Sequence, residues 1–557
     1  MTTLEKLYLP ATDPVTHVTD HFTSKEKLQD WFLAQPHAQP LDFARNMYDA
    51  LYTLNRMEVE RELRHQLNLG FLHNFEIHLP ALQILYESNT ISTQPKAKSA
   101  WNFAKDLYIE LGIAFKRSLT EEVNRRFGMS DKQVARLIAL CLDLNQRLLL
   151  TSFQNYHPVP EHTWQDCHTL FYYALQHKLL DEAPKEDELQ IVPLYKESLL
   201  LGLCDPYSLL NGEILQVKNW LQKLGGYAAL QSVSNLSDPS GYFLIKLDED
   251  NPPQFMGHRP VDLNGYHQLL LNCFDVVRRI YRELPPLEKV AASASTYYRA
   301  TQHIDLLRRL IRSWGIAPQR VFNRMRNNAK VELVSELSTV HRILAKSKNL
   351  RLTKEENPEE NQEATLDNLE SPSHLEMNLP FVHQQEEHIS QWKVINVSAG
   401  GYALGLESDE INHIAVGRIV ILKSDSGDRW NVAAVRWVKQ NAHIEIGLQL
   451  LAPDAEPILI RPVIHSAGAI FETGLLLPAV QELRQPASIV APAGFFAPLR
   501  EFEILRGPHT LTARSIRRMT QGLGVDQFEF ITPAEVEALL EMPLFDNKEG
   551  SSDNKVA

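Results

Sequence analysis

The change in hydrophobic periodicity near residue 315 constrains the fold of this chain more than any other feature. From about Ser24 to Trp314, apolar residues recur at spacings of three and four, the pattern of amphipathic helices. This pattern stops at Gly315 and Pro318, because glycine and proline break helices. Beyond the break, short runs rich in Val and Ile alternate with turn residues, which indicates β-strands. The sequence therefore predicts an α+β multidomain chain, with an all-α half followed by β domains.

The helical half carries no repeat of constant period. Helix pairs recur, but no signature returns every ~34 or ~40 residues, as regular helical repeats require. Ser130 and Gln133 have the spacing of a capping box at the start of one helix. We therefore expect an irregular helical array, with one short strand at 242–247. The predicted helices are residues 41–69, 98–127, 133–153, 163–180, 189–203, 214–230, 261–283 and 287–313.

The pattern divides the chain into four parts. Residues 1–315 form the predicted helical domain, and residues 316–465 a small antiparallel β-barrel, because short strands recur between turns. Within the barrel, the eight acidic residues of segment 354–376 predict a disordered acidic insert over about 350–385. Residues 466–545 form a second small β domain with a short C-terminal helix, and residues 546–557 form a flexible tail.

Composition narrows the classes of partner and the compartment. The net charge of −13 disfavours non-specific binding to nucleic acid or anionic lipid. The chain has no apolar run of about 18 residues, so we predict no membrane span. The four cysteines form no CxxC pair, and the N-terminus lacks the pattern of a signal peptide. These features predict a cytoplasmic protein without a disulfide framework.

The sequence lacks the common catalytic and metal-binding motifs. The chain contains no Gly-x-Ser-x-Gly, no P-loop and no HExxH motif, so we predict that it is not an enzyme and carries no cofactor. An enzyme of another kind in the helical half is the alternative that remains open. His162 and Asp166 share a helix face, but Cys167 and His168 point elsewhere, so we predict no metal site there. Arg61 and Arg64, interleaved with Glu60 and Glu62, are interpreted as part of a solvated helix face.

The segment from Asn396 to Gly401 stands out between two strand-like runs. Asn396 and Ser398 are two residues apart, so on an extended backbone their side chains point to the same face. Both can hydrogen-bond to the flat edge of a ligand. Gly400 and Gly401 allow a turn and leave bare backbone beside it. A plain hairpin turn uses the same residue types, so the motif needs further support.

That support is a resemblance to a known family. Asn396-x-Ser398-x-x-Gly401 resembles the (Asp/Asn)-x-Ser-x-x-Gly motif of PilZ domains, small bacterial β-barrels that bind cyclic di-GMP. The strands that follow, including one with a central Trp437 and one with Gly447-x-Gln449, are similar to the strand order of the family. The resemblance implies a PilZ-like barrel whose Asn396 and Ser398 hydrogen-bond to a guanine edge and whose Gly401 keeps the strand start clear.

The second PilZ signature is an Arg-x-x-x-Arg pair before the first barrel strand. Arg320 and Arg324 resemble it in spacing and lie between the helix break and the first strand-like run. Guanidinium groups can meet the O6 and N7 acceptors of guanine as a fork, and can stack on the bases. With the acidic insert between them, Arg324 and Asn396 are 72 positions apart. The chain can accommodate this insert because the entropic cost of closing a loop grows only with the logarithm of its length. The same spacing occurs at Arg278/Arg282, Arg308/Arg312 and Arg514/Arg518, away from the start of the barrel.

The resemblance implies a function as well as a fold. We expect a cyclic di-GMP receptor whose ligand site comprises Arg320, Arg324, Asn396, Ser398 and Gly401, and which relays nucleotide level to an unidentified protein partner through the helical domain. The position of the arginine pair in the interdomain connector suggests that ligand binding orders this connector. The alternative is a degenerate PilZ-like scaffold that binds protein partners without nucleotide.

Overall fold

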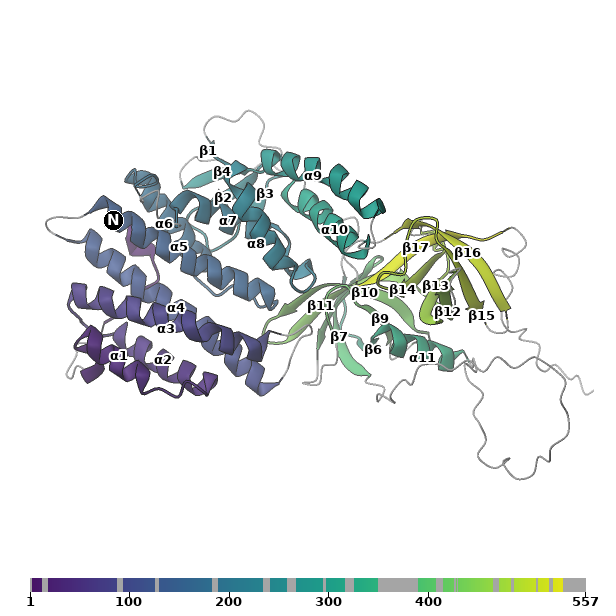
Figure 1. Ribbon diagram of the computed structural model, residues 1–557, viewed down its shortest axis with the longest axis horizontal. Coiled ribbons are helices and arrows are strands. Elements are labelled where there is room, and N and C mark those ends of the chain that lie inside the picture. The colour runs from purple at the N-terminus through teal and green to yellow at the C-terminus, as the bar shows by residue number, and fades with distance from the viewer. Residues whose placement is uncertain are drawn as a thin grey trace, which may run out of the picture. The chain divides into compact units, whose positions relative to one another are not determined.

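The computed structural model divides into two compact units. Unit 1 contains Met1–Asn323, Gly405–Val416 and Arg436–Gly447, and unit 2 contains the rest of the chain. In Figure 1 the helices of unit 1 run from purple to teal, and the last strands of unit 2 are yellow. The structure describes residues 3–12, 19–87, 94–125, 130–182, 189–233, 241–257, 267–293, 297–315, 325–348, 389–406, 414–424, 427, 429–463, 470–481, 485–506, 509–519 and 524–533.

Helices make up most of unit 1, as the sequence predicts. The long helices α3, α4 and α5 lie side by side, and α9 packs against α10 (Figure 1). Ser130 caps α5 as expected, because its hydroxyl accepts a hydrogen bond from the Gln133 amide at 3.4 Å. The helices are α1 (Lys25–Leu33), α2 (Pro40–Leu54), α3 (Arg61–Tyr86), α4 (Pro95–Val123), α5 (Asp131–Gln154), α6 (Thr163–Gln176), α7 (Ile191–Leu203), α8 (Glu213–Leu224), α9 (Phe274–Ser293) and α10 (Tyr297–Trp314), with short 3-10 turns at Thr3–Lys6, Asp20–Phe22, Pro206–Ser208 and Gly225–Tyr227.

The predicted helix 41–69 is two helices, and buried Arg64 explains the break. Its guanidinium donates to the carbonyl oxygens of Leu54 at 3.2 Å and Met57 at 2.8 Å, which end α2 and its following turn. Arg64 is 2% exposed and also pairs with Glu121 at 2.8 Å. The interpretation of Arg64 as a solvated residue was therefore wrong. Glu60 then starts α3 by accepting a hydrogen bond from the Leu63 amide at 3.0 Å.

A small antiparallel sheet interrupts the helices, where the sequence pattern predicted a helix over 261–283. Strand β4 occupies the middle of that range, and its Leu270 and Leu271 are fully buried between β1 and β2. A short apolar run fits a helix or a strand equally well, and here the two neighbouring strands decide. The predicted strand at 242–247 is part of this sheet. Its strands, in the order β1-β4-β2-β3, are β1 (Ala229–Ser232), β2 (Phe243–Lys246), β3 (Gln254–Phe255) and β4 (Gln268–Asn272).

Helix α9 also differs from the prediction, because it continues through Pro285 and Pro286. Both prolines are exposed, and so are Tyr281 and Arg282, whose carbonyls lose their amide donors. Water can hydrogen-bond to these carbonyls, so the helix tolerates the two prolines.

The first β structure is a sheet that closes on itself. Its order is β5-β7-β6-β9-β10-β11-β8, and an additional pairing of β7 with β8 joins the two sides. Helix α11 (Leu337–Ser347) packs on β6 and β9. The strands are β5 (Met325–Arg326), β6 (Lys330–Ser335), β7 (Ser390–Ser398), β8 (Gly401–Leu406), β9 (Ile419–Ser424), β10 (Asn431–Gln440) and β11 (Ile444–Ala452).

The second β structure is a closed barrel in the order β12-β13-β14-β17-β16-β15. It starts with β12, whereas the predicted domain boundary at 466 follows that strand; no break in the strand-like pattern separates β12 from β11. Val334 and Ile421 of the first sheet share one buried cluster with Leu475 and Val490 of this barrel. The strands are β12 (Glu456–Pro462), β13 (Glu472–Leu477), β14 (Ser488–Pro492), β15 (Glu501–Arg506), β16 (His509–Arg518) and β17 (Val525–Ile531).

Some sequence predictions fall outside the described residues. These are the acidic insert over about 350–385, the short C-terminal helix near residue 540 and the tail 546–557. Within the described ranges, no helix combines the length and apolar character that a membrane crossing needs. The same part of the chain holds no group of three or more His, Cys, Asp or Glu side chains that could bind a metal.

Candidate ligand-binding site

The side chains of β7 alternate between the core and the outside of the barrel. Trp392 and Val394 are buried, whereas Ile395 between the core-facing positions is 39% exposed. Continuing this alternation, Asn396 and Ser398 share the core-facing row and lie half-buried where the row ends. The structure thus brings these two predicted site residues together on one face, with polar groups that can hydrogen-bond to a ligand.

The turn after Ser398 is packed directly on β11. The carbonyl of Gly400 accepts a hydrogen bond from the Leu450 amide at 3.0 Å. Gly401 has φ +155°, and a Cβ there would lie 1.9 Å from the carbonyl oxygen of Leu448. Only glycine fits this position, because the obstacle is backbone and the conformation disfavours any side chain. The Ser398 hydroxyl donates to the Gly401 carbonyl at 3.4 Å, so its lone pairs remain available to accept from a ligand.

A residue that the sequence analysis did not single out also reaches this face. Arg326 on β5 lies directly opposite Asn396 on β7. Further along the same two strands, Lys330 lies opposite Lys393. Between these two pairs the chain advances four residues from Arg326 to Lys330, but β7 spans only three from Lys393 to Asn396. The extra residue is a β-bulge, with the Asn327 side chain accepting a hydrogen bond from the Ala329 amide at 2.8 Å. Without the bulge, Asn327 would face Asn396 instead.

The predicted arginine pair cannot be placed in the same way. Arg320 and Arg324 lie outside the described residues, so their role stays a prediction. Arg326 follows Arg324 by two positions in the sequence. The sequence shows Arg326 as a third arginine close to the predicted pair. The face to which its side chain points depends on the bulge, which the spacing of residues does not reveal.

The strand pattern that carried the family resemblance has a structural reason. Trp437 of β10 covers Gly447 of β11, and a Cβ at Gly447 would lie 1.8 Å from the indole Nε1. The indole therefore requires glycine across from it, which explains why a central Trp and a following Gly occur together in these two strands.

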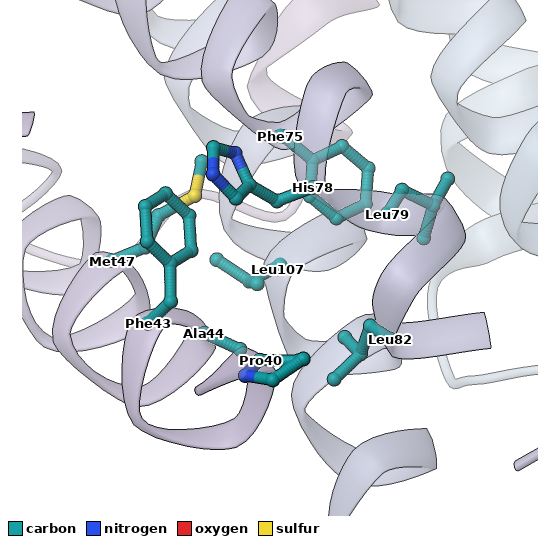
Figure 2. Close-up of a pocket in the computed structure, with 9 residues that line it drawn as sticks. All are labelled: Pro40, Phe43, Ala44, Met47, Phe75, His78, Leu79, Leu82 and Leu107. Atoms are coloured by element: carbon teal, nitrogen blue, oxygen red, sulfur yellow. The ribbon is translucent and has the colours of Figure 1, made fainter. Parts of the chain in front are cut away.

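The helical unit contains a separate pocket, shown in Figure 2. His78 stacks on Phe43 with 3.7 Å between ring centroids, and its Nε2 lies 2.8 Å from Nδ1 of His37. The lining of the pocket is apolar apart from the His78 ring and holds no arginine or lysine, so it offers no guanidinium or ammonium group to the phosphates of a cyclic dinucleotide. It is lined by Pro40, Phe43, Ala44, Met47, Phe75, His78, Leu79, Leu82 and Leu107.

Family models match three consecutive parts of the chain. The model described as "Cyclic-di-GMP receptor FimW, N-terminal domain" matches residues 26–235. The middle PilZ domain of that receptor matches residues 242–380 and 360–457, and the FimW C-terminal beta-barrel domain matches residues 458–532. The chain belongs to the FimW family. A curated relative in the FimW family, the cyclic-di-GMP receptor FimW of Pseudomonas aeruginosa, is 25% identical over 565 residues, which cover 92% of this chain and 91% of that protein.

Membership in the FimW family confirms the PilZ resemblance and the predicted α+β architecture. The middle model covers Asn396, Ser398 and Gly401, the described residues of the candidate site. The last model begins at residue 458, within β12, in agreement with the start of the second barrel. The family models describe a cyclic di-GMP receptor, and cyclic di-GMP is the ligand that the sequence motif implied.

Proposed function

We propose that this protein is a non-catalytic cyclic di-GMP receptor that relays nucleotide level to a protein partner through its helical domain. The observation that carries the proposal is the shared face of Asn396 and Ser398, next to the bare backbone at Gly401. The Asn396 amide offers donors and an acceptor to the edge of a guanine, and the hydroxyl of Ser398, which itself donates to the Gly401 carbonyl, offers acceptor lone pairs. Arg320 and Arg324 would complete the site by meeting guanine acceptors or phosphates.

Isothermal titration with cyclic di-GMP tests the receptor function. We expect binding at micromolar affinity or tighter, which corresponds to roughly −8 kcal/mol. Asn396→Ala should weaken binding about tenfold, as expected for one hydrogen bond to a charged or strongly polar ligand. Arg320→Ala/Arg324→Ala should abolish it. Gln391→Ala is the matched control, because it removes an amide from the exposed, outward-facing row of the same strand.

A flat titration at about millimolar nucleotide, with a folded protein, would contradict the receptor function. The degenerate scaffold that binds only protein partners would then be the better description. Equal loss of affinity in Asn396→Ala and Gln391→Ala would place the nucleotide elsewhere on the barrel.

The relay rests on a hairpin whose end belongs to unit 1. The end of β10 and the start of β11 fall within Arg436–Gly447, which clusters with the helical half. In this hairpin the Gln440 backbone amide donates to the Tyr156 carbonyl at 2.7 Å, and its side chain donates to the Asn155 carbonyl at 2.9 Å. These contacts connect the strands directly with the C-terminal end of α5.

Hydrogen exchange tests this relay. Adding cyclic di-GMP should change the exchange of amides around Asn155 and Tyr156 in the wild type. Gln440→Ala should reduce that change and leave nucleotide affinity intact, because Gln440 is not a site residue. Unchanged exchange in this segment at saturating nucleotide would rule out a relay through the hairpin.

A cytoplasmic location is part of the same proposal. All four cysteines are buried and free, namely Cys141, Cys167, Cys204 and Cys273. Burial raises the pKa of Cys141, Cys167 and Cys273 to about 12, so these thiols stay protonated and unreactive. Free thiols without disulfides are typical of proteins from reducing compartments.

A further inference from the structure

Arg326 is exposed and lies at the surface of the first barrel. Within the described part of the chain, no carboxylate or other side chain pairs with its guanidinium. The nearby basic residues of the same barrel differ in this respect: Arg418 pairs with Glu336 at 3.4 Å, and Lys423 pairs with Glu332 at 3.5 Å. An unpaired guanidinium beside a ligand motif keeps all five of its donors available.

The position of Arg326 is set by the bulge described above. Residues directly opposite each other in antiparallel strands place their side chains on the same face, with Cβ atoms about 4.5–5.5 Å apart. Arg326 and Asn396 are such a pair, so the guanidinium rises from the face on which Asn396 and Ser398 lie. Bulges commonly redirect a side chain next to a functional site, and this one replaces an asparagine with an arginine opposite Asn396.

We infer that Arg326 is a third arginine of the nucleotide site, which contacts a phosphate or guanine of the cyclic dinucleotide held at Asn396. This inference rests on the proposed receptor function. A cyclic dinucleotide carries two phosphate charges and two guanines, more acceptors than Asn396 and Ser398 can satisfy. A guanidinium fork satisfies two acceptors at once. Its positive charge also attracts the phosphates, which the net negative charge of the chain would otherwise repel.

The flanking sequence fits this role. Met325, which precedes Arg326, is 69% exposed and faces Val397 on the outward row, so the two residues of β5 point to opposite faces. Arg326 thus points to the ligand face because of the strand geometry, without needing a packing partner to orient it.

Titration of three variants tests the inference against the wild type. Arg326→Ala should weaken cyclic di-GMP binding about tenfold or more, the usual effect of losing a charged hydrogen bond. Arg326→Lys should recover only part of the affinity, because lysine keeps the charge but lacks the fork. Lys393→Ala is the matched control, since it removes one positive charge from the outward face of β7. Circular dichroism and the urea midpoint establish that each variant is folded.

The outcomes separate this inference from the proposed function. Tight binding by the wild type with no loss in Arg326→Ala would overturn the inference and leave the receptor function intact. Equal losses in Arg326→Ala and Lys393→Ala would also overturn it, because they would show only a long-range effect of charge. A wild type that binds no nucleotide would overturn both. The double variant Arg326→Ala/Asn396→Ala should lose less than the sum of the single losses if both residues hold one ligand.

Discussion

The indole of Trp437 fills the space that a side chain on Gly447 would need, with 1.8 Å between the indole Nε1 and the position of a Cβ at 447. The two residues lie in β10 and β11, so an aromatic residue of one strand dictates a glycine in the next. Both residues belong to the strand pattern that resembles the PilZ family, and this packing is the physical reason for that pattern.

Gly447→Ala should destabilise the protein by about 1–3 kcal/mol, the usual effect of overpacking a well-filled site. In the background Trp437→Ala, the same substitution should have almost no further effect, because the indole that it meets is gone. Urea unfolding of the four proteins measures this coupling. Strictly additive effects would contradict the pairing.

Gly401→Ala should be more harmful, because the Cβ would lie 1.9 Å from the backbone oxygen of Leu448 and the residue has φ +155°. Backbone cannot rotate aside as a side chain can, and the conformation itself is strained for alanine. We expect a loss of about 3 kcal/mol or more, measured by urea unfolding. Gly427→Ala is the control, since its nearest atom would lie 3.8 Å away. Similar losses in the two variants would show that the close approach at Gly401 is relieved.

Lys116 and Asp166 form an ion pair deep in the helical unit, with side chains 6% and 5% exposed. Lys116→Met should destabilise the protein by about 3–5 kcal/mol, because it leaves a buried carboxylate without its cation. Lys116→Met/Asp166→Asn should regain most of this loss, since the asparagine can still accept the hydrogen bond from the Tyr8 amide, now at 3.1 Å. Thermal unfolding compares the variants. A double variant as unstable as Lys116→Met would mean that packing, not charge, sets the loss.

His341 predicts a dependence of stability on pH. Burial lowers its pKa to about 4, and its ring donates through Nε2 to the Ile458 carbonyl at 3.1 Å. As pH falls below about 6.5, His341 of the unfolded chain takes up a proton before His341 of the folded chain does. The free energy of unfolding therefore falls between about pH 6.5 and 4, and the full contribution of His341 is present above about pH 6.5. The contribution of His341 to this loss between pH 7 and 5 is about 2 kcal/mol.

Urea unfolding at pH 7 and pH 5 measures this dependence. His341→Gln cannot titrate, so its stability should fall less than that of the wild type over the same interval. His157 and His168, whose pKa values burial also lowers to about 4, titrate in both proteins and cancel in the comparison. An equal fall in both proteins would exclude His341 as a contributor.

The sequence predicted those parts of the fold and site that depend on local pattern. The alternation along a strand placed Asn396 and Ser398 on one face, and the glycine at 401 is required where the motif has it. Features that depend on contacts with residues distant in the sequence could not be predicted. Arg64 is buried because α2 ends beside it, and the direction of Arg326 depends on a bulge relative to β7. Periodicity describes one element at a time, so it cannot report either relationship.

The closure of the second barrel limits how another protein can recognise it. Because β12 pairs with both β13 and β15, the ring of strands has no free edge among the described residues. A partner therefore cannot dock by adding a strand of its own, the mode of recognition that exposed sheet edges permit. Any protein that binds this barrel must read the side chains on its wall or the loops at its two ends, and its affinity will depend on residue identity more than on backbone pairing.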